Sequence, residues 1–372
     1  MAKISNLSYH YLRDVDNDFM HIENLCNVNN FVSNFMYGLP VIHTWDLIEN
    51  ENIADGDGQK YETRFQTVQS RYSSKFLGLY KGISVYTLTV NHIPVNAKNI
   101  SPSDYEGHHL FDLLFGNKTN IPIDRVTGDG HSVNQINFVA LDAIDINFIP
   151  NINDIHSEAE KLYSSEDPEK YTGFFKPHKQ INRVLIQSQK RGIIRVLLSL
   201  ILQENTQAVI VRKLSSHKRY CRLSAALWEY NKIFKSIHVL NLINDVTLRK
   251  VLKKSRNRTE AYHQLQRTIR KVHGGVFVGK TIVNNAVNMH ASRLVANCII
   301  AYNAMLLNAV YLRLVKKVGE EKAKKIIGRI SPVAWQHLIF TGRYRFANGQ
   351  NSIDLEQFIE MLERKLDDIA NK

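Results

Sequence analysis

The stretch Phe76-Leu77-Gly78-Leu79-Tyr80-Lys81-Gly82-Ile83-Ser84-Val85-Tyr86-Thr87-Leu88-Thr89-Val90 decides the class of fold. From Ile83 to Val90 it is rich in β-branched and aromatic residues, which are typical of buried strands. Residues 76–80 have a similar composition, and Lys81-Gly82 between the two runs predicts a two-residue turn, because glycine adopts a positive φ at no steric cost. We therefore expect a β-hairpin inside a β-rich region that begins near residue 52.

The residues around this hairpin predict a mixed sheet followed by a long helical region. Before it, residues 1–50 read as helical pieces joined by loops. After it, a short helix is expected over residues 104–115, and short strands over residues 125–129 and 144–149 with a helix between them. Beyond Pro150 the strand signals fade, and residues 178–272 carry apolar side chains at helical spacing. The fold class is therefore α/β.

Length and composition exclude several classes of protein. The chain has 372 residues, 44% of them hydrophobic and 22% charged, so it can bury a sizeable core as two domains or as one core with a large insertion. Its three cysteines include no CxxC pair and predict neither a disulfide framework nor a zinc site, which fits a reducing compartment. We expect Trp45, Trp228 and Trp335 to be core anchors.

Neither a secretory signal nor a membrane span is expected. The first residues contain no apolar run and turn acidic by Asp14. One uncharged run, residues 294–312, does reach the length of a membrane span. It contains Asn297, Asn303 and Asn308, which are costly in lipid, so a buried helix is the better interpretation.

The net charge of +13 hides a strong asymmetry along the chain. Residues 1–150 contain 10 Lys and Arg against 17 Asp and Glu, whereas residues 151–372 contain 38 against 18. Within residues 201–350 the count is 27 basic to 6 acidic. Such an excess is tolerable when a polyanion lies alongside, so the basic helical region predicts nucleic-acid binding.

Two aspartates stand between glycines at predicted strands, Asp57 in residues 54–61 and Asp129 in residues 128–132. Carboxylates hold hard divalent cations, and small neighbours allow a metal and a phosphate to approach the backbone closely. Asp-Gly is also a common turn signal, so each match alone is compatible with a turn and nothing more.

A third acid, Glu260, interrupts an otherwise basic segment. In a helix its polar side would carry Glu260, His263, Arg267 and Arg270, and the apolar side would carry Ala261, Leu265, Ile269 and Val272. Glu260 is then either a metal ligand among phosphate-binding partners or one half of an intrahelical pair with an arginine.

Residues 274–281 satisfy the P-loop pattern GxxxxGK[ST] letter for letter. The motif needs a strand before it, however, and here a helix is predicted to precede it. We therefore expect no ATP binding.

At these motifs the chain resembles the C-terminal catalytic region of the transposases of replicative class II transposons, the Tn-three family. Residues 57–59 are similar to the family's Asp-Gly-Gln motif, and residues 129–131 to its second aspartate motif. Residues 257–260, followed by His263, are similar to its glutamate motif. Further family signatures are similar to residues 296–303, 331–337 and 342–346.

The resemblance implies an RNase H-like mixed sheet flanked by helices, interrupted by a large all-α insertion and followed by a helical C-terminal region. Asp57, Asp129 and Glu260 would form the DDE triad, and the 131 residues between the last two leave room for the insertion. The expected division is a helical leader (1–50), a core with two acids (51–155), an insertion (156–250), the glutamate helix with C-terminal helices (251–346) and a terminal helix (347–372).

The implied activity is Mg²⁺-dependent cleavage of DNA 3′ ends and strand transfer in replicative transposition. The triad would hold two Mg²⁺ ions, for which Mn²⁺ can substitute. His131 and His263 would orient phosphate or support the acids, or else be ordinary satisfied histidines. The phosphate contacts expected from the basic region are Arg212, Lys213, Lys218, Arg219, Arg222, Lys250, Lys253, Lys254, Arg256, Arg258 and Arg267.

The chain also departs from the family. Pro150-Asn151 stands where members often have Pro-Arg, and the N-terminal parts with which members recognise inverted repeats have no counterpart here. We therefore expect a truncated transposase, acting on DNA as a homodimer or with full-length transposase in a bacterial cytoplasm, at the nucleoid, without membrane contact. A catalytically silent DNA-binding remnant that interferes with full-length transposase and an independent RNase H-type nuclease are the alternatives.

Overall fold

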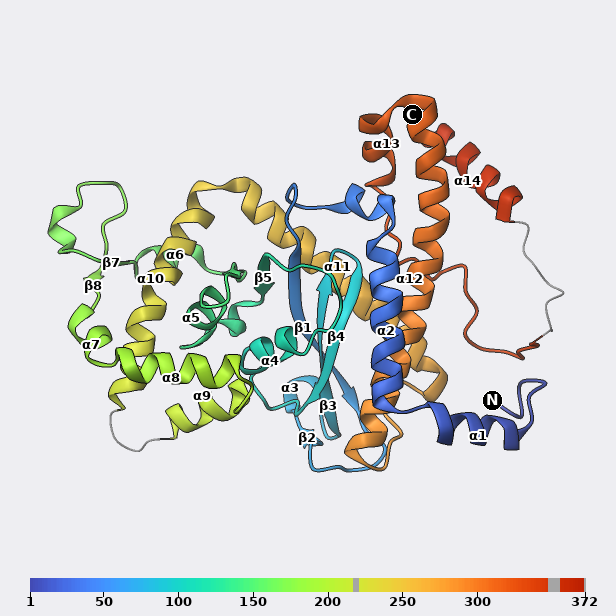
Figure 1. The fold of residues 1–372 in the computed structure, drawn as a ribbon, viewed down its shortest axis with the longest axis horizontal. Helices are drawn as coiled ribbons and strands as arrows, with labels where there is room; N and C mark the ends of the chain where they lie inside the picture. Colours follow the sequence, from blue (N-terminus) through green and yellow to red (C-terminus); the bar gives the residue numbers. More distant parts are fainter. Residues whose placement is uncertain (217–220, 347–354, 371–372) are drawn as a thin grey trace.

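The computed structural model describes residues 1–216, 221–346 and 355–370, and its architecture is mixed α/β (Figure 1). At its centre β3 pairs antiparallel with β1, β4 and β2, while β1, β5 and β6 run parallel to one another. The strands are β1 (Ile53–Glu62), β2 (Arg71–Tyr72), β3 (Lys81–Val90), β4 (Ile93–Ile100), β5 (Arg125–Gly128) and β6 (Asn147–Phe148).

The predicted hairpin is wrong in its first strand and in its turn. Residues 76–80 contain the end of the short helix α3 (Ser74–Leu77) and the turn after it, while Lys81 and Gly82 lie inside β3. Gly82 is needed for close strand packing, because a Cβ there would lie 2.0 Å from the carbonyl oxygen of Tyr61 on β1. The hairpin is formed by β3 and β4, whose turn at Asn91-His92 uses a positive φ of 55° at Asn91.

The other short elements agree with the prediction. Residues 106–115 form a 3-10 turn, η2 (Glu106–His109), and the helix α4 (Leu110–Phe115). The helix α5 (Asn137–Asp142) lies between β5 and β6 as expected. The P-loop-like residues 274–281 form a loop that follows a helix and a 3-10 turn, η5 (Lys271–His273), so the strand that the motif requires is not there.

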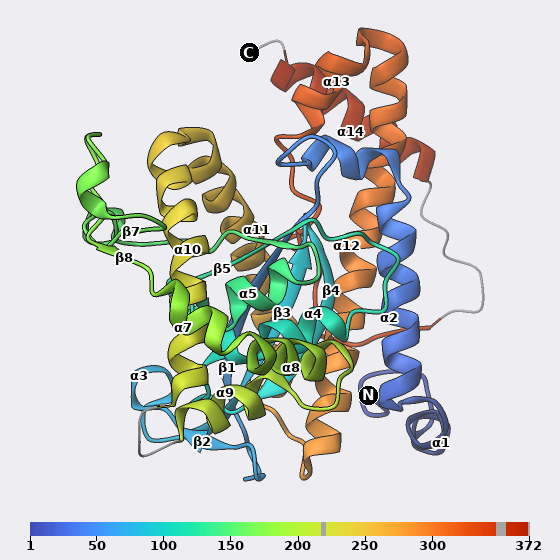
Figure 2. The same ribbon diagram turned by 60° about the vertical axis from the view of Figure 1, so that its left-hand side comes forward.

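A helical region packs over one side of the sheet (Figure 2). Its helices α9 and α10 contact α4, α5 and η2. Two short strands that the sequence did not indicate, β7 (Tyr163–Ser164) and β8 (Lys179–Gln180), form a small sheet of their own. The helices are α6 (Ile155–Ala159), α7 (Arg183–Ser188), α8 (Lys190–Ile201), α9 (Gln207–Ser215) and α10 (Arg222–Asn244).

Two long helices complete the core, α11 (Val246–Arg270) and α12 (Ile282–Val318). The N-terminal helix α2 (Ile22–Tyr37) runs along α12 (Figure 1), and their buried amides meet where Asn297 donates to Asn29 at 2.9 Å. Smaller helices α1 (Tyr9–Phe19), α13 (Glu320–Ile327) and α14 (Leu355–Ala370) lie at the chain ends.

Within the described residues α12 is the one helix long and apolar enough to cross a membrane. Arg293 and Asn297 on it are fully buried in the protein, and half of its most apolar window is buried too. These are features of a core helix, in agreement with the sequence interpretation of residues 294–312.

The three tryptophans differ in environment. Trp45, in the 3-10 turn η1 (Pro40–Trp45), is 2% exposed and donates from Nε1 to the carbonyl oxygen of Ile330. Trp335 is partly buried against the same core. Trp228 is 40% exposed, so its predicted role as a core anchor is wrong.

We expect Trp45→Ala to lower the free energy of unfolding by about 3–5 kcal/mol, because it leaves a large cavity and an unpaired carbonyl. Trp228→Ala is the matched control and should cost less than half of that. Urea denaturation of both variants measures the difference, and an equal loss would contradict the core assignment.

A second prediction concerns pH. Burial, with a smaller contribution from Arg293, lowers the pKa of His290 on α12 to about 4. The unfolded chain takes up this proton near pH 6.5 and the folded chain only near pH 4, so stability is lost as the pH falls through that window. The contribution of His290 lowers the free energy of unfolding by about 3 kcal/mol over this pH range.

His290→Gln should therefore flatten the dependence of the free energy of unfolding on pH between 6.5 and 4. The exposed His273 provides the control substitution, His273→Gln, which should leave that dependence unchanged. Urea titrations at several pH values test both, and a His290→Gln curve parallel to the wild type would refute the prediction.

Candidate active site

Strand β1 carries three polar side chains on one face, since residues two apart in a strand point the same way. They are Asp55, Asp57 and Gln59, and Asp55 is only 3% exposed. This face lies against α11, as the hydrogen bond from Gln59 Nε2 to the carbonyl oxygen of His263 shows at 3.1 Å. The sheet therefore presents its acids to the helix that carries Glu260.

The face of α11 that packs on the sheet is polar, which corrects the predicted helix orientation. Thr259, His263, Gln266 and Arg270 are all buried, although His263 and Arg270 were expected on the solvent side. The Thr259 hydroxyl is 2.6 Å from the hydroxyl of Thr89 on β3. Hydrogen bonds to a polar strand face, and not apolar packing alone, thus determine how the helix is rotated.

Glu260 lies at the edge of this contact, close to Asp57. Ligand atoms of Asp57, Glu260 and His263 all lie within 4.8 Å of one another. The imidazole Nδ1 of His263 is 3.7 Å from Asp57 Oδ2 and 3.9 Å from Glu260 Oε2. Glu260 also accepts a hydrogen bond of 2.6 Å from Arg267 Nη2, so the intrahelical pair exists as well.

Asp129 follows β5 and faces the same open cleft, of about 720 Å³, as Asp57. Because β1 and β5 are parallel neighbours, Asp57 on β1 and Asp129 directly after β5 lie at the same level of the sheet. Asp129 lies outside the cluster formed by Asp57, Glu260 and His263. His131, exposed, and Arg256, from the solvent side of α11, also line this cleft.

The opposite wall of the cleft is fixed by Glu106. Its carboxylate accepts from Lys60 Nζ at 2.5 Å and from Ser84 Oγ at 3.0 Å. It lies directly over Gly58, where a Cβ would be 2.1 Å from the carboxylate. A side chain at residue 58 would therefore displace the Glu106 carboxylate from this position.

The helical region between β6 and α11 binds and positions the loops that form the wall of the cleft at Glu106. Gln207 at the start of α9 is fully buried, donates to the carbonyl oxygen of Gly107 at 3.1 Å and accepts from the backbone N–H of Phe111 at 2.9 Å. Asn137 donates to the carbonyl oxygens of Gly107 and Ser132 at 2.9 and 2.6 Å. One buried amide network thus links the residues around Glu106 to those after Asp129.

The acids of the site have different pKa values for identifiable reasons. Burial raises the pKa of Asp55 to about 6. Burial also raises the pKa of Asp57, against the opposing effect of the nearby His263. The imidazole of His263, and then the Arg267 guanidinium, hold the pKa of Glu260 down at about 2.

The donor set suits a hard divalent cation. Asp57, Asp129 and Glu260 supply carboxylate oxygens, the ligands that Mg²⁺ and Mn²⁺ prefer. The buried Oδ2 of Asp55 beside them has no hydrogen-bond partner. Burial raises the pKa of Asp55 and Asp57, and a bound cation would stabilise their charged forms.

The residues predicted to bind phosphate differ in placement. Arg256 lines the cleft. Arg258 is half-buried and hydrogen-bonded to Asn91, and burial lowers its pKa to about 10, so its phosphate contact stays a prediction. Lys218 and Arg219 lie outside the described residues. The exposed remainder consists of Arg212, Lys213, Arg222, Lys250, Lys253, Lys254 and Arg267, of which Arg267 pairs with Glu260.

Sequence reasoning missed four residues that shape the site, namely Asp55, Gln59, Glu106 and Thr259. The alternation Asp55-Gly56-Asp57 in a strand was a usable signal, because it places both acids on one face. Nothing near Glu106 in the sequence indicated that it lies over Gly58, since this contact depends on tertiary packing.

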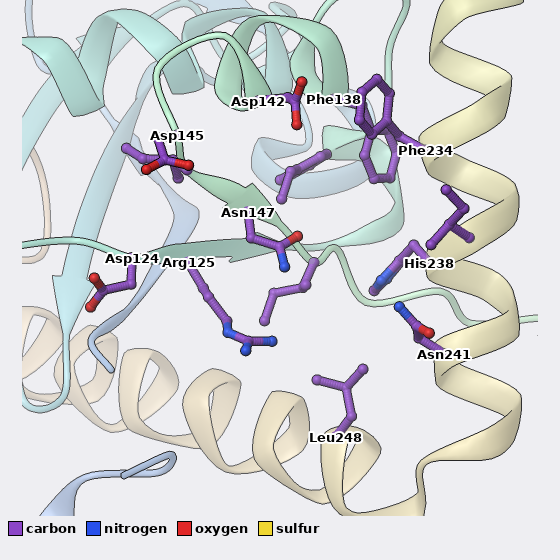
Figure 3. Close-up of a pocket in the computed structure, with 14 residues that line it drawn as sticks. Asp124, Arg125, Phe138, Asp142, Asp145, Asn147, Phe234, His238, Asn241 and Leu248 are labelled. Atoms are coloured by element: carbon purple, nitrogen blue, oxygen red, sulfur yellow. The ribbon is translucent and has the colours of Figure 1, made fainter. Parts of the chain in front are cut away.

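A second cavity, of about 360 Å³, lies between β5, β6, α5 and α10 (Figure 3). Three of the polar or charged side chains that line it have structural partners. Asp124 accepts from the backbone N–H of Asn52 at 2.7 Å, Arg125 pairs with Glu51, and His238 donates to the carbonyl oxygen of Pro150 at 2.7 Å. It contains none of the predicted catalytic acids.

Comparison with known proteins identifies the family of the chain. The family model for the Tn3 transposase DDE domain matches residues 1–344. The transposase for transposon Tn1546 of Enterococcus faecium is 24% identical over 352 residues, which cover 94% of this chain and 35% of that protein. The transposase for transposon gamma-delta of Escherichia coli (strain K12) is 22% identical over 369 residues, 92% of this chain and 34% of that protein. The chain spans about a third of the length of the relatives it matches, and over that length it belongs to the family of the Tn3 transposase DDE domain.

Proposed function

We propose that this chain is the DDE catalytic domain of a transposase, which cuts a DNA strand to a 3′ end and transfers that end to target DNA in replicative transposition. The observation that carries the proposal is the meeting of Asp57 on β1 with Glu260 and His263 on α11, within 4.8 Å, although the chain between them is long. Asp129 in the same cleft would complete the triad.

The order of the strands supports an RNase H-like core. An antiparallel unit of β4, β3 and β1 is continued by parallel β5 and β6, and the acids stand on β1 and directly after β5. The division into core, insertion over residues 156–250 and C-terminal helices remains our proposal on this basis.

Asp57, Asp129 and Glu260 would hold two Mg²⁺ or Mn²⁺ ions. When bound, these ions supply Lewis-acid stabilisation of the charge that develops on the phosphate oxygens. His263, buried between two of the acids, keeps Glu260 ionised and ready as a ligand. Arg256 at the cleft would position the phosphate, and His131 at the cleft surface would assist it.

The chemistry would proceed as two in-line displacements at phosphorus. Water attacks first, so that the P–O3′ bond breaks and the strand leaves with a free 3′-OH. This hydroxyl then attacks a phosphate of target DNA, which forms a new P–O bond and expels the target's own 3′ oxygen. Because two transposon ends must be joined, two copies of the site are needed, and we propose a homodimer or an assembly with full-length transposase.

One observation favours a second function, a catalytically silent DNA-binding remnant that interferes with full-length transposase. Glu260 is engaged by Arg267, and Asp129 is not one of the three residues whose ligand atoms lie within 4.8 Å of one another. Nicking of DNA in Mg²⁺ separates the two functions.

Asp129→Asn should abolish nicking while DNA binding is retained, because the change removes a negative ligand with almost no change in volume. We expect strand cleavage in Mg²⁺ to fall by more than about 100-fold. Asp142→Asn makes the same chemical change at the second cavity and serves as the control. Cleavage of labelled plasmid DNA measures the effect, and wild-type cleavage by Asp129→Asn would exclude this acid from the site.

DNA affinity should depend strongly on salt. If about five cationic side chains contact phosphates, log K falls with log salt at a slope of roughly −4 to −5. Replacing both Lys253 and Lys254 with alanine should reduce the slope by about 2. Replacing Lys322 and Lys325, exposed on α13 away from the sheet, should leave it unchanged. Fluorescence anisotropy with a 40-base-pair duplex at several salt concentrations provides the test, and a flat response in the wild type would contradict phosphate binding.

A further inference from the structure

The cleft that holds Asp57 and Asp129 continues to two exposed aromatic rings. Phe76 on α3 is 53% exposed and Tyr105, just before η2, is 52% exposed, and both line the cleft. Single exposed apolar side chains are common on proteins and need no explanation. Two rings beside a cluster of acids in one cleft form a defined surface, which we call the aromatic wall.

Cationic side chains lie over this wall. Lys60 Nζ is 4.4 Å and Lys75 Nζ 4.9 Å from the centroid of the Phe76 ring. Lys60 is already paired with Glu106. Lys75 is exposed, so its ammonium group can turn from the ring to a phosphate.

The wall is also held in place. The Tyr105 ring stacks on His108 with centroids 5.3 Å apart, and its edge contacts His131 at 6.1 Å. Lys60, which donates to Glu106 at 2.5 Å, lies with its Nζ 4.4 Å from the centroid of the Phe76 ring. Rings that are fixed before a ligand arrives lose little conformational entropy on binding.

Aromatic rings beside lysines are the features with which proteins bind unpaired nucleotides. Any base can stack on an aromatic ring, whereas the cationic groups hold the backbone. In a duplex the faces of the bases are covered by their neighbours, so such rings are useful only for a nucleotide that has left the stack. A cleft of about 720 Å³ lies within the size range of pockets for small molecules, about 300–1,000 Å³.

We propose that the aromatic wall binds an unpaired nucleotide next to the phosphate that is cut, with its base stacked on Phe76 or Tyr105 and its phosphate on Lys75. The proposal rests on the function proposed above, because the carboxylates at the other end of the cleft fix where the scissile phosphate lies. It adds that the DNA is locally unpaired when it is bound.

The test compares two 40-base-pair duplexes that differ only in a central mismatched bubble of three nucleotides. Affinities of the full chain are measured by fluorescence anisotropy in Ca²⁺, a hard cation that takes the same oxygen ligands, and the labelled strand is checked afterwards to confirm that it is uncut. We expect the wild type to bind the bubble roughly tenfold more tightly than the paired duplex. At least one of Phe76→Ala and Tyr105→Ala, the one that removes the ring on which the base stacks, should lose most of this preference, and both should keep their affinity for the paired duplex.

Leu79→Ala is the matched control, since Leu79 is 92% exposed in the same loop region. It should keep the preference, and Phe76→Trp should restore it, because a larger ring still stacks. Equal affinity of the wild type for both duplexes, or an unchanged preference in both alanine variants, would overturn the inference. Nicking of the paired duplex in Mg²⁺ is measured separately. Absence of nicking would argue against the proposed function, whereas the binding preference for the bubble tests the aromatic wall.

Discussion

The polar contact between α11 and the face of β1 is the interaction on which the site depends. A buried hydroxyl or amide costs free energy unless it is hydrogen-bonded, so the pairs Thr89–Thr259 and Gln59–His263 permit only one rotation and one height of the helix on the sheet. Since Glu260 follows Thr259 directly, that rotation also brings its carboxylate to Asp57. A helix with a purely apolar face could slide or turn with little penalty, and the distance between the acids would then be loosely defined.

The long chain between Asp129 and Glu260 has its own part in this geometry. It leaves the sheet after β6, forms α6 to α10 and returns as α11, and on the way Gln207 binds the loop at Gly107. That loop also receives Asn137, so the segments next to Glu106 and Asp129 are fixed by a shared buried amide network. The helical region therefore stabilises the wall of the cleft opposite α11, which gives it a structural role beyond carrying positive charge.

The sequence predicted much of the fold and proposed three catalytic acids, but it did not predict their surroundings. Composition alone indicated β3, and motif resemblance indicated Asp57, Asp129 and Glu260. The prediction of a strand at residues 76–80 was wrong because local β propensity cannot show whether a partner strand exists. Gly82 was predicted to form a turn, whereas it lies in a strand and allows close packing against the neighbouring strand. The predicted orientation of α11 was wrong because a prediction from periodicity takes the apolar face as the buried one, and here buried polar side chains meet a polar strand face.

The electrostatics of the cleft link metal binding to DNA binding in the proposed function. Four acids line the cleft, Asp57, Asp104, Glu106 and Asp129, against three cationic side chains, Lys60, Lys75 and Arg256. Burial already raises the pKa of Asp57, so a phosphate brought beside it would add repulsion at short range. Divalent cations would remove that repulsion and be held more tightly once phosphate oxygens are present, because coupling between two ligands is reciprocal. The cationic residues further along α11 would then supply affinity for the DNA backbone, while the acids make its entry into the cleft dependent on the metal.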